Sequence, residues 1–141
     1  MSWYLLVLKK YAIFEGRSRR KEYWYFTLFD LLFTQILRLV DAAAGTAFYY
    51  GLGVLSGLYS LAVLIPAIAV GIRRLHDTNR SGWWLLLGYL TPLLVLLHGL
   101  WRLLSLVLLI ATITLTVFLA RDGDTGENRY GANPRTSAVT S

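Results

Sequence analysis

The adjacent side chains of His76 and Asp77 are the pair in this sequence best suited to chemistry. An imidazole beside a carboxylate can move a proton or respond to pH near neutrality. Neighbouring residues of a helix do not face each other, so the two side chains do not form a ready dyad. Asp77 can equally pair with Arg73, Arg74 or Arg80 and fix the surrounding loop. We favour this structural role, and with no second histidine nearby we expect no metal site.

Arginines dominate the polar segments on both sides of this pair. If the fold gathers them, they form a basic surface that attracts anionic lipid at about 1 kcal/mol per residue. Guanidinium forks match phosphate oxygens in geometry, which suits such a role. The simpler interpretation, that these residues only orient the chain in a membrane, carries slightly more weight. The arginines concerned are Arg17, Arg19, Arg20, Arg73, Arg74 and Arg80.

A polar stripe lies inside the first long apolar stretch. Thr34 and Arg38 follow Asp30 at i+4 and i+8, so the three residues share one helix face. In a channel or transporter this stripe would line a solute or proton path. Because a single intramembrane acid is few for a transporter, we favour a pairing of Asp30 with a neighbouring helix or a position closer to the surface.

The run from Asp122 to Tyr130 resembles a calcium loop, with two carboxylates followed by glycine. The EF-hand pattern fails, because its fifth and twelfth positions are glycine and asparagine. We expect instead a turn that folds Glu127 and Arg129 against the arginines, with Glu127 and Asp77 as their acidic partners. No catalytic triad or nucleotide fingerprint is present, so the sequence predicts no cofactor and favours a non-enzymatic protein.

The composition excludes an ordinary soluble domain. Of 141 residues, 56% are hydrophobic and 16% charged, and the mean hydropathy is +0.53. The absence of cysteine excludes a disulfide scaffold. We predict an all-α membrane protein with four transmembrane helices. The apolar stretches lie at about 23–40, 49–72, 83–98 and 103–120.

The third and fourth stretches are separated only by a two-residue turn at Gly99 and Leu100. We predict a tight helical hairpin, and a re-entrant pair is the alternative. Six basic residues precede the first stretch, three lie between the second and third, and three follow the fourth. If all four stretches cross the membrane, 12 of the 14 lysines and arginines lie on one side of it. The positive-inside rule makes that side cytoplasmic, together with both termini.

The tryptophans and the net charge agree with this topology. All five tryptophans fall at predicted span boundaries, which suits the headgroup layer. The charge of +6 therefore indicates membrane orientation, and we expect no nucleic-acid partner.

The chain divides into an interfacial segment, a membrane domain and a tail. The first segment contains an expected surface helix over Ser2–Phe14, and the tail is expected to be disordered from about Ala132. Gly53 and Gly57 form a Gly-x-x-x-Gly motif for close packing against another span or a second subunit, which leaves a homo-oligomer open. The boundaries are 1–22, 23–120 and 121–141.

Three separated motifs occur in an order that resembles one family. They are Trp3-Tyr4 with Leu8–Tyr11 and Gly16–Trp24, Arg73–Thr78 with Arg80–Trp84, and Asp122-Gly123 with Thr125–Gly131 and Pro134. This order resembles the domain-of-unknown-function 805 family, the YhaH-type bacterial inner-membrane proteins, over residues 2 to 135. The resemblance implies a small multi-span protein of the bacterial inner membrane, and it brings no activity or catalytic residue. Asp124 and the tripeptide Ala132–Pro134 depart from the family pattern.

The hypothesis that we prefer is a non-enzymatic inner-membrane scaffold whose basic cytoplasmic face binds anionic lipid or a membrane-protein partner. Its candidate binding residues are the six arginines with His76, Asp77, Glu127 and Arg129. A small channel or transporter that uses Asp30, Thr34 and Arg38 is the alternative. A third hypothesis is an enzyme that acts on a phosphorylated lipid at the loop of His76 and Asp77.

Overall fold

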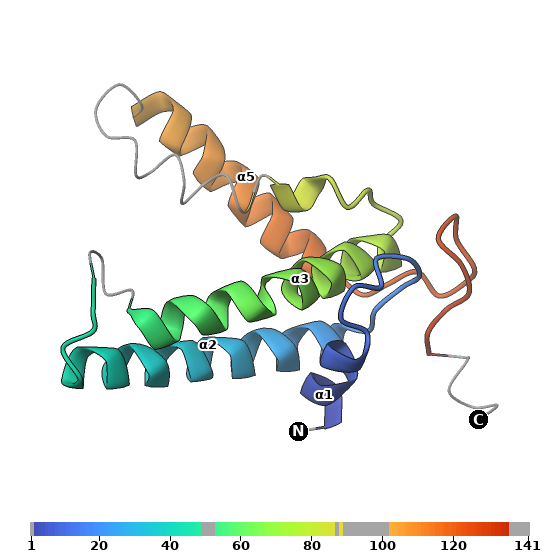
Figure 1. Ribbon diagram of the computed structural model, residues 1–141. Helices are drawn as coiled ribbons and strands as arrows, with labels where there is room; N and C mark the ends of the chain where they lie inside the picture. The colour runs from blue at the N-terminus through green and yellow to red at the C-terminus, as the bar shows by residue number, and fades with distance from the viewer. Residues whose placement is uncertain (1, 49–52, 87, 89–101, 136–141) are drawn as a thin grey trace. The chain divides into compact units, whose positions relative to one another are not determined.

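A computed structural model describes residues 2–48, 53–86, 88 and 102–135 (Figure 1). Within these ranges the long elements are all helices, which confirms the all-α prediction for the described residues: α1 (Ser2–Lys9), α2 (Arg20–Ala43), α3 (Val54–Asp77) and α5 (Arg102–Ala120). Two isolated bridges, Ala47 with Gly53 and Asn128 with Gly131, are the β pairings in this part of the chain.

The chain folds as two compact units, which we describe separately. The first unit comprises Met1–Ile13 and Lys21–Val70. The second comprises Phe14–Arg20 and Gly71–Ser141, and it contains most of the motifs singled out in the sequence.

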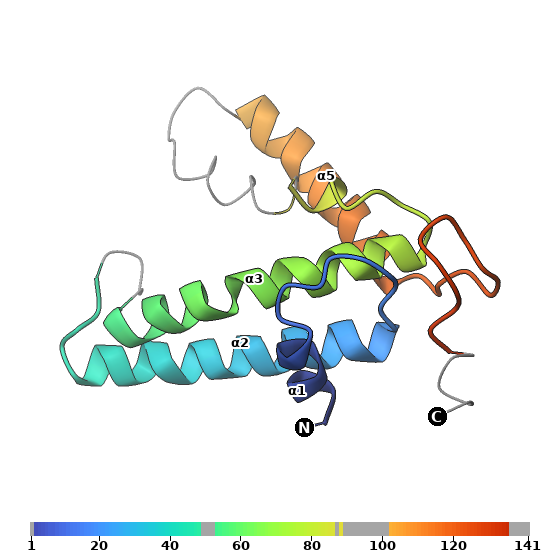
Figure 2. The same ribbon diagram turned by 45° about the vertical axis from the view of Figure 1, so that its right-hand side comes forward.

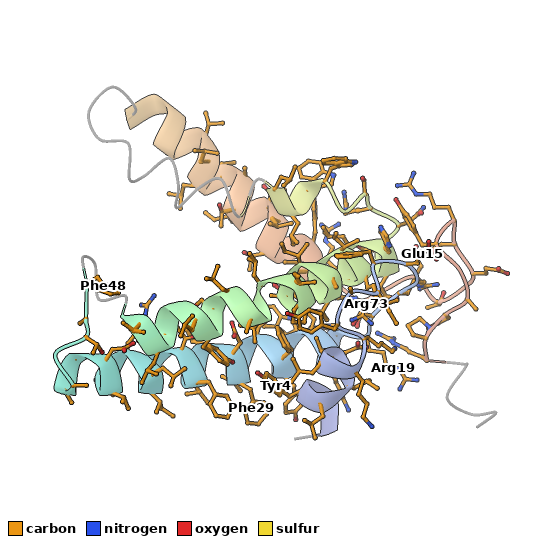
Figure 3. The ribbon with its side chains drawn as sticks, viewed as in Figure 1. Tyr4, Glu15, Arg19, Phe29, Phe48 and Arg73 are labelled. Atoms are coloured by element: carbon orange, nitrogen blue, oxygen red, sulfur yellow. The ribbon has the colours of Figure 1, made fainter. Side chains whose placement is uncertain are left out.

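In the first unit, α2 lies beside the first part of α3, as two views show (Figures 1 and 2). Their apolar contact buries Phe26 of α2 and Val63 and Val70 of α3, together with Val7 of α1. Tyr4 of α1 stacks on Phe26 with ring centroids 5.2 Å apart. Its ring also meets the edge of Phe29, and both residues are labelled in Figure 3. Helix α1 thus packs onto the helix pair through its aromatic face.

Helix α1 is shorter than the predicted Ser2–Phe14. It ends at Lys9, where the amide of Lys10 donates to the carbonyls of Leu6 and Val7 and closes the last turn. The chain then leaves the helical path, and Tyr11 donates its hydroxyl to the carbonyl of Ala62 at 2.5 Å. A tertiary contact therefore holds this stretch in place of further helix.

Asp41 explains where α3 begins. This side chain, which is closed off from solvent at the end of α2, accepts hydrogen bonds from the amides of Leu55 at 3.0 Å and Ser56 at 2.8 Å. The hydroxyl of Thr46 donates to it at 2.8 Å. Asp41 therefore caps α3 from the preceding helix, and α3 starts at Val54, later than the predicted boundary at residue 49.

The glycines of the Gly-x-x-x-Gly motif do not act as a pair within this unit. Gly53 precedes α3, and a Cβ atom on it would lie 2.2 Å from the Cγ atom of Asp41. Gly57 has open space where its side chain would be. In this chain Gly53 makes room for the capping carboxylate, and packing of the motif against a second subunit stays a prediction.

One described helix, Val54–Asp77, is long and apolar enough to cross a membrane by length and composition. Leu106–Ala120 is a shorter apolar helical stretch. A stripe of exposed apolar side chains also runs along α2, formed by Leu28, Leu31, Leu32, Ile36 and Leu39. Of the predicted third stretch, residues 84–86 and 88 are helical, and most of the remainder, with the turn at Gly99 and Leu100, lies outside the described residues.

Candidate functional site

The second unit is centred on a buried carboxylate held by two guanidinium groups. Asp77, the last residue of α3, lies 3.0 Å from the Nε atom of Arg17 and 2.5 Å from the Nη1 atom of Arg74. None of the three side chains is more than 3% exposed. A charge without a partner is costly in such a place, so each group requires the others. We call Arg17, Arg74 and Asp77 the arginine clasp.

The side chain of Arg17 also organises the C-terminal segment, residues 121–135, by binding backbone carbonyls of that segment. Its guanidinium donates to the carbonyls of Asp124 at 2.6 Å, Gly126 at 2.7 Å and Gly131 at 3.3 Å. Because a guanidinium has a fixed fork of donors, carbonyls that converge on it must hold one loop shape. Arg17 is therefore the centre around which the loop folds.

Arg74 ties the end of α5 to the same carboxylate. Its Nε atom donates to the carbonyl of Leu119 at 2.9 Å, and its Nη2 atom donates to the carbonyl of Arg121. The last carbonyls of a helix lack intrahelical partners and carry partial negative charge, so a buried cation is well placed there. The clasp thus joins residues 14–20, the end of α3 and the end of α5.

Two glycines of the C-terminal segment permit this close contact. A Cβ atom on Gly123 would lie 1.8 Å from an oxygen of Asp77, so no side chain fits at this position. The next amide, that of Asp124, donates to the carbonyl of Asp77 at 2.9 Å. Gly131 has a φ of 116°, a conformation that glycine adopts without strain.

His76 contacts residues other than those of the clasp. Its Nδ1 atom lies 3.2 Å from the carbonyl oxygen of Gly16, and its ring stacks on Tyr130 at 3.8 Å. Burial lowers the pKa of His76, the hydrogen bond with Gly16 opposes this shift, and the charge of Arg129 lowers the pKa further. His76 and Asp77 thus have separate sets of partners, which fits the structural role that we favoured and leaves no dyad.

The last described residues are held in place, against the expectation of disorder from Ala132. Arg19 donates through its Nε atom to the carbonyl of Pro134 at 2.8 Å. The buried side chain of Asn133 donates to the carbonyl of Thr125 at 2.7 Å. Side-chain bonds to the backbone order this polar stretch, which its composition could not indicate. Residues 136–141 lie outside the described part.

Asp122 is a residue that the sequence reasoning missed. It lies 2.9 Å from Arg20 and 3.1 Å from Arg135, and all three side chains are exposed. Hydrogen bonds from the two arginines lower the pKa of this carboxyl. Glu127, the predicted partner, is exposed, and no ion pair involves it within the described residues. The position of Asp122 directly after the fourth apolar stretch, in a polar segment with Arg121 and Arg135, could have indicated an acidic partner for these arginines.

The six predicted arginines do not form one exposed surface. Arg17, Arg73 and Arg74 are at most 7% exposed, so they are inaccessible to a phosphate in this conformation. Arg73, in the last part of α3, and Arg19, directly before α2, are labelled in Figure 3. Arg20 is exposed, and Arg80 stacks over the ring of Phe118 with 3.5 Å between its Cζ atom and the ring centroid. The predicted basic surface is therefore divided into a buried and an exposed part.

The polar stripe of α2 belongs to the first unit. Asp30 forms a side-chain hydrogen bond with Tyr59 of α3, whose hydroxyl lies 3.0 Å from that of Tyr4. Thr34 and Arg38 are half-buried, and the Nε atom of Arg38 has no partner among the described residues. The contact with Tyr59 gives Asp30 a partner on a neighbouring helix. In the described residues no three acidic or histidine side chains come together to hold a metal ion.

These features define a helical protein with one described helix long and apolar enough to cross a membrane, whose loop segments carry a buried ionic centre. The chain belongs to the family described as "Protein of unknown function (DUF805)", whose model matches residues 11–132. It is 42% identical to "Inner membrane protein YhaH" of Escherichia coli strain K12 over 135 residues, which are 96% of this chain and 98% of that protein.

Two further relatives also come from Escherichia coli strain K12. "Inner membrane protein YhaI" is 42% identical over 96% of this chain and 97% of its own length. "Uncharacterized protein YiiR" is 31% identical over 84% of this chain and 83% of its own length. No solved structure matches the chain. The names of the first two relatives support a location in the bacterial inner membrane.

Proposed function

We propose that the chain is a multi-pass inner-membrane protein with four spans and both termini in the cytoplasm. In this proposal it acts as a non-enzymatic scaffold whose folded cytoplasmic cap, residues 14–20, 73–81 and 121–135, presents basic side chains to anionic lipid. The arginine clasp is the structural centre of the cap. The single observation that carries the proposal is the contact of these three polar segments through the clasp.

That contact supports the proposed topology. Arg17 precedes the first apolar stretch, Asp77 follows the second, and Arg121 follows the fourth. Polar segments that touch lie on the same side of a bilayer, so an even number of crossings separates each from the next. Two crossings before Asp77 and two after it meet this requirement. A re-entrant pair in place of the last two spans meets this requirement as well, so an experiment must distinguish the two topologies.

Cysteine labelling tests the topology, since the chain contains no cysteine of its own. We expect a membrane-impermeant maleimide to label Ala44→Cys from the periplasm, and to label Asn79→Cys and Thr125→Cys only after permeabilisation. Gly99→Cys, at the predicted turn, should be labelled from the periplasm if the last two stretches both cross. Protection of Gly99→Cys with the other results unchanged indicates a re-entrant pair, and external labelling of Asn79→Cys contradicts the proposal.

The exposed arginines of the cap support the lipid-binding part of the proposal. Among the described residues, the ion-pair partner of Arg20 and of Arg135 is the exposed Asp122, and exposed ion pairs hold their partners weakly. Arg121 is exposed directly after α5, at the expected depth of the headgroups. These three residues replace the buried ones as candidates for contact with anionic lipid.

Native mass spectrometry of the purified full chain in mild detergent tests this role. We expect a preference for phosphatidylglycerol over phosphatidylethanolamine, and we expect Gln at all three positions to abolish it. At about 1 kcal/mol per basic residue, the triple change weakens anionic binding on the order of a hundredfold. Lys at the same positions keeps the charge and should keep the preference. Equal binding of the two lipids by the wild type contradicts the lipid role, and the same spectra report the number of subunits.

The two alternative functions have less support. The hydrogen bond of Asp30 with Tyr59 gives this acid a role in helix pairing, although solute flux that is lost in Asp30→Asn proteoliposomes would establish a transport path. An enzyme at the loop of His76 and Asp77 would need an available carboxylate, and Arg17 and Arg74 occupy this one.

A further inference from the structure

Arg80 differs from the buried Arg17 and Arg74 and from the exposed Arg129 in what its guanidinium contacts. Arg17 and Arg74 donate to Asp77 and to carbonyls, and Arg129 donates to the carbonyl of Asn79 at 3.1 Å. The Nε atom of Arg80 is buried without a hydrogen-bond partner, and no ion pair involves this residue within the described part of the chain. Its charge is therefore uncompensated by any described side chain.

Aromatic rings fix the position of this guanidinium. Its Cζ atom lies 3.5 Å from the centroid of Phe118 on α5. The ring of Trp84 in turn meets Phe118 edge-on at 5.4 Å. Stacking on a ring leaves the in-plane donors of a guanidinium free to bind a ligand. Arg80 is therefore an oriented cation with unused donors.

The side chains next to Arg80 are those of a membrane interface. Trp83 is 77% exposed and Trp84 is 37% exposed, which is unusual for such large apolar rings. Indole rings favour the headgroup layer, where the ring meets apolar chains and the N–H group meets polar atoms. Since Trp84 and Arg80 both contact Phe118, a ligand at this place would meet a cation and an indole ring together.

We infer that Arg80, positioned by Phe118 and flanked by Trp83 and Trp84, binds the phosphodiester group of a phospholipid. The guanidinium donates from its free edge to the phosphate oxygens, and the indole rings lie against the glycerol and the first acyl carbons. The inference rests on the proposed placement of residues 73–81 at the headgroup layer. Because every phospholipid carries the phosphodiester, the site accepts both anionic and zwitterionic headgroups.

Native mass spectrometry of the full chain with added phosphatidylethanolamine or phosphatidylglycerol tests the site. We expect Arg80→Gln to weaken retention of both lipids about fivefold, the ratio that corresponds to the net contribution of one hydrogen bond. Arg80→Lys is the matched comparison, since it keeps the charge at this position and removes the planar fork of donors. It should retain more of both lipids than Arg80→Gln.

A second variant covers the case in which Arg80→Gln fails to fold. Phe118→Leu keeps the charge and removes the ring that orients it, and it should weaken retention of both lipids by a smaller factor. Full retention in either folded variant, or displacement of the lipid by inorganic phosphate, overturns the inference. Equal binding of the two lipids by the wild type contradicts the anionic preference of the proposed function. The site at Arg80 is still supported in that case if Arg80→Gln weakens the retention of both lipids.

Discussion

Replacement of Asp77 by asparagine tests the arginine clasp most directly. The change keeps the shape of the side chain and removes its negative charge, so two buried guanidinium groups lose their ionic partner. Breaking a buried ion pair by removing one partner costs about 3 to 5 kcal/mol. Arg17 and Arg74 keep their bonds to backbone carbonyls, which places the expected cost near the lower end, about 3 kcal/mol.

Hydrogen exchange of the C-terminal segment measures this cost. The amide of Asp124 donates to the carbonyl of Asp77 and that of Gly131 to the carbonyl of Asn128, so both are protected while the loop is closed. A loss of about 3 kcal/mol makes local opening roughly two orders of magnitude more frequent, since each 1.4 kcal/mol is about tenfold. We expect the Asp77→Asn protein to exchange these amides faster by that factor.

Asp122→Asn is the matched control, because Asp122 also binds two arginines but is exposed. Solvent screens such pairs, and we expect little change in exchange. Equal exchange rates in the wild type and in Asp77→Asn would refute the reasoning. So would an effect of Asp122→Asn as large as that of Asp77→Asn, because burial would then not decide the strength of the pair.

The remaining predictions concern the same loop and the start of α3. Gly123→Ala places a methyl group against Asp77 and should open the loop, whereas Gly126→Ala, with open space at its Cβ position, should leave amide exchange unchanged. Burial and the nearby guanidinium of Arg129 lower the pKa of His76 in the folded protein, so the unfolded state binds more protons. The stability of the loop should therefore fall as the pH drops below about 6.5, the ordinary pKa of histidine. His76→Gln should remove this pH dependence, as thermal unfolding at pH 7.5 and 5.5 would report. Burial alone would raise the pKa of Asp41, but hydrogen bonds lower it to about 2, so its stabilising effect should persist above pH 4 and disappear as the pH falls through 2. Asp41→Asn should lower the unfolding temperature at neutral pH, and an unchanged temperature would show that the cap on α3 is dispensable.

Local patterns in the sequence predicted the helices, because each depends on a continuous apolar run. The stretch at 103–120 agrees with α5 to within a residue at its start, and the stretch at 23–40 lies within α2. The observed helix boundaries differ from the predicted ones where a side chain that is distant in sequence forms a hydrogen bond near the end of a helix. Asp41 delays the start of α3, and the hydrogen bond of Tyr11 replaces the last turn of the predicted first helix.

The sequence by itself determined that the chain is apolar and helical, that its arginines cluster in the polar segments, and to which family it belongs. These properties depend on residue types and their local order. Only the tertiary structure decided which arginines are buried and which remain exposed. Arg17 and Arg74 bind Asp77 and backbone carbonyls that lie up to 114 residues away in the chain, and no local pattern encodes such convergence. Burial makes these arginines structural, whereas Arg80 keeps unused donors because its nearest partner is a ring.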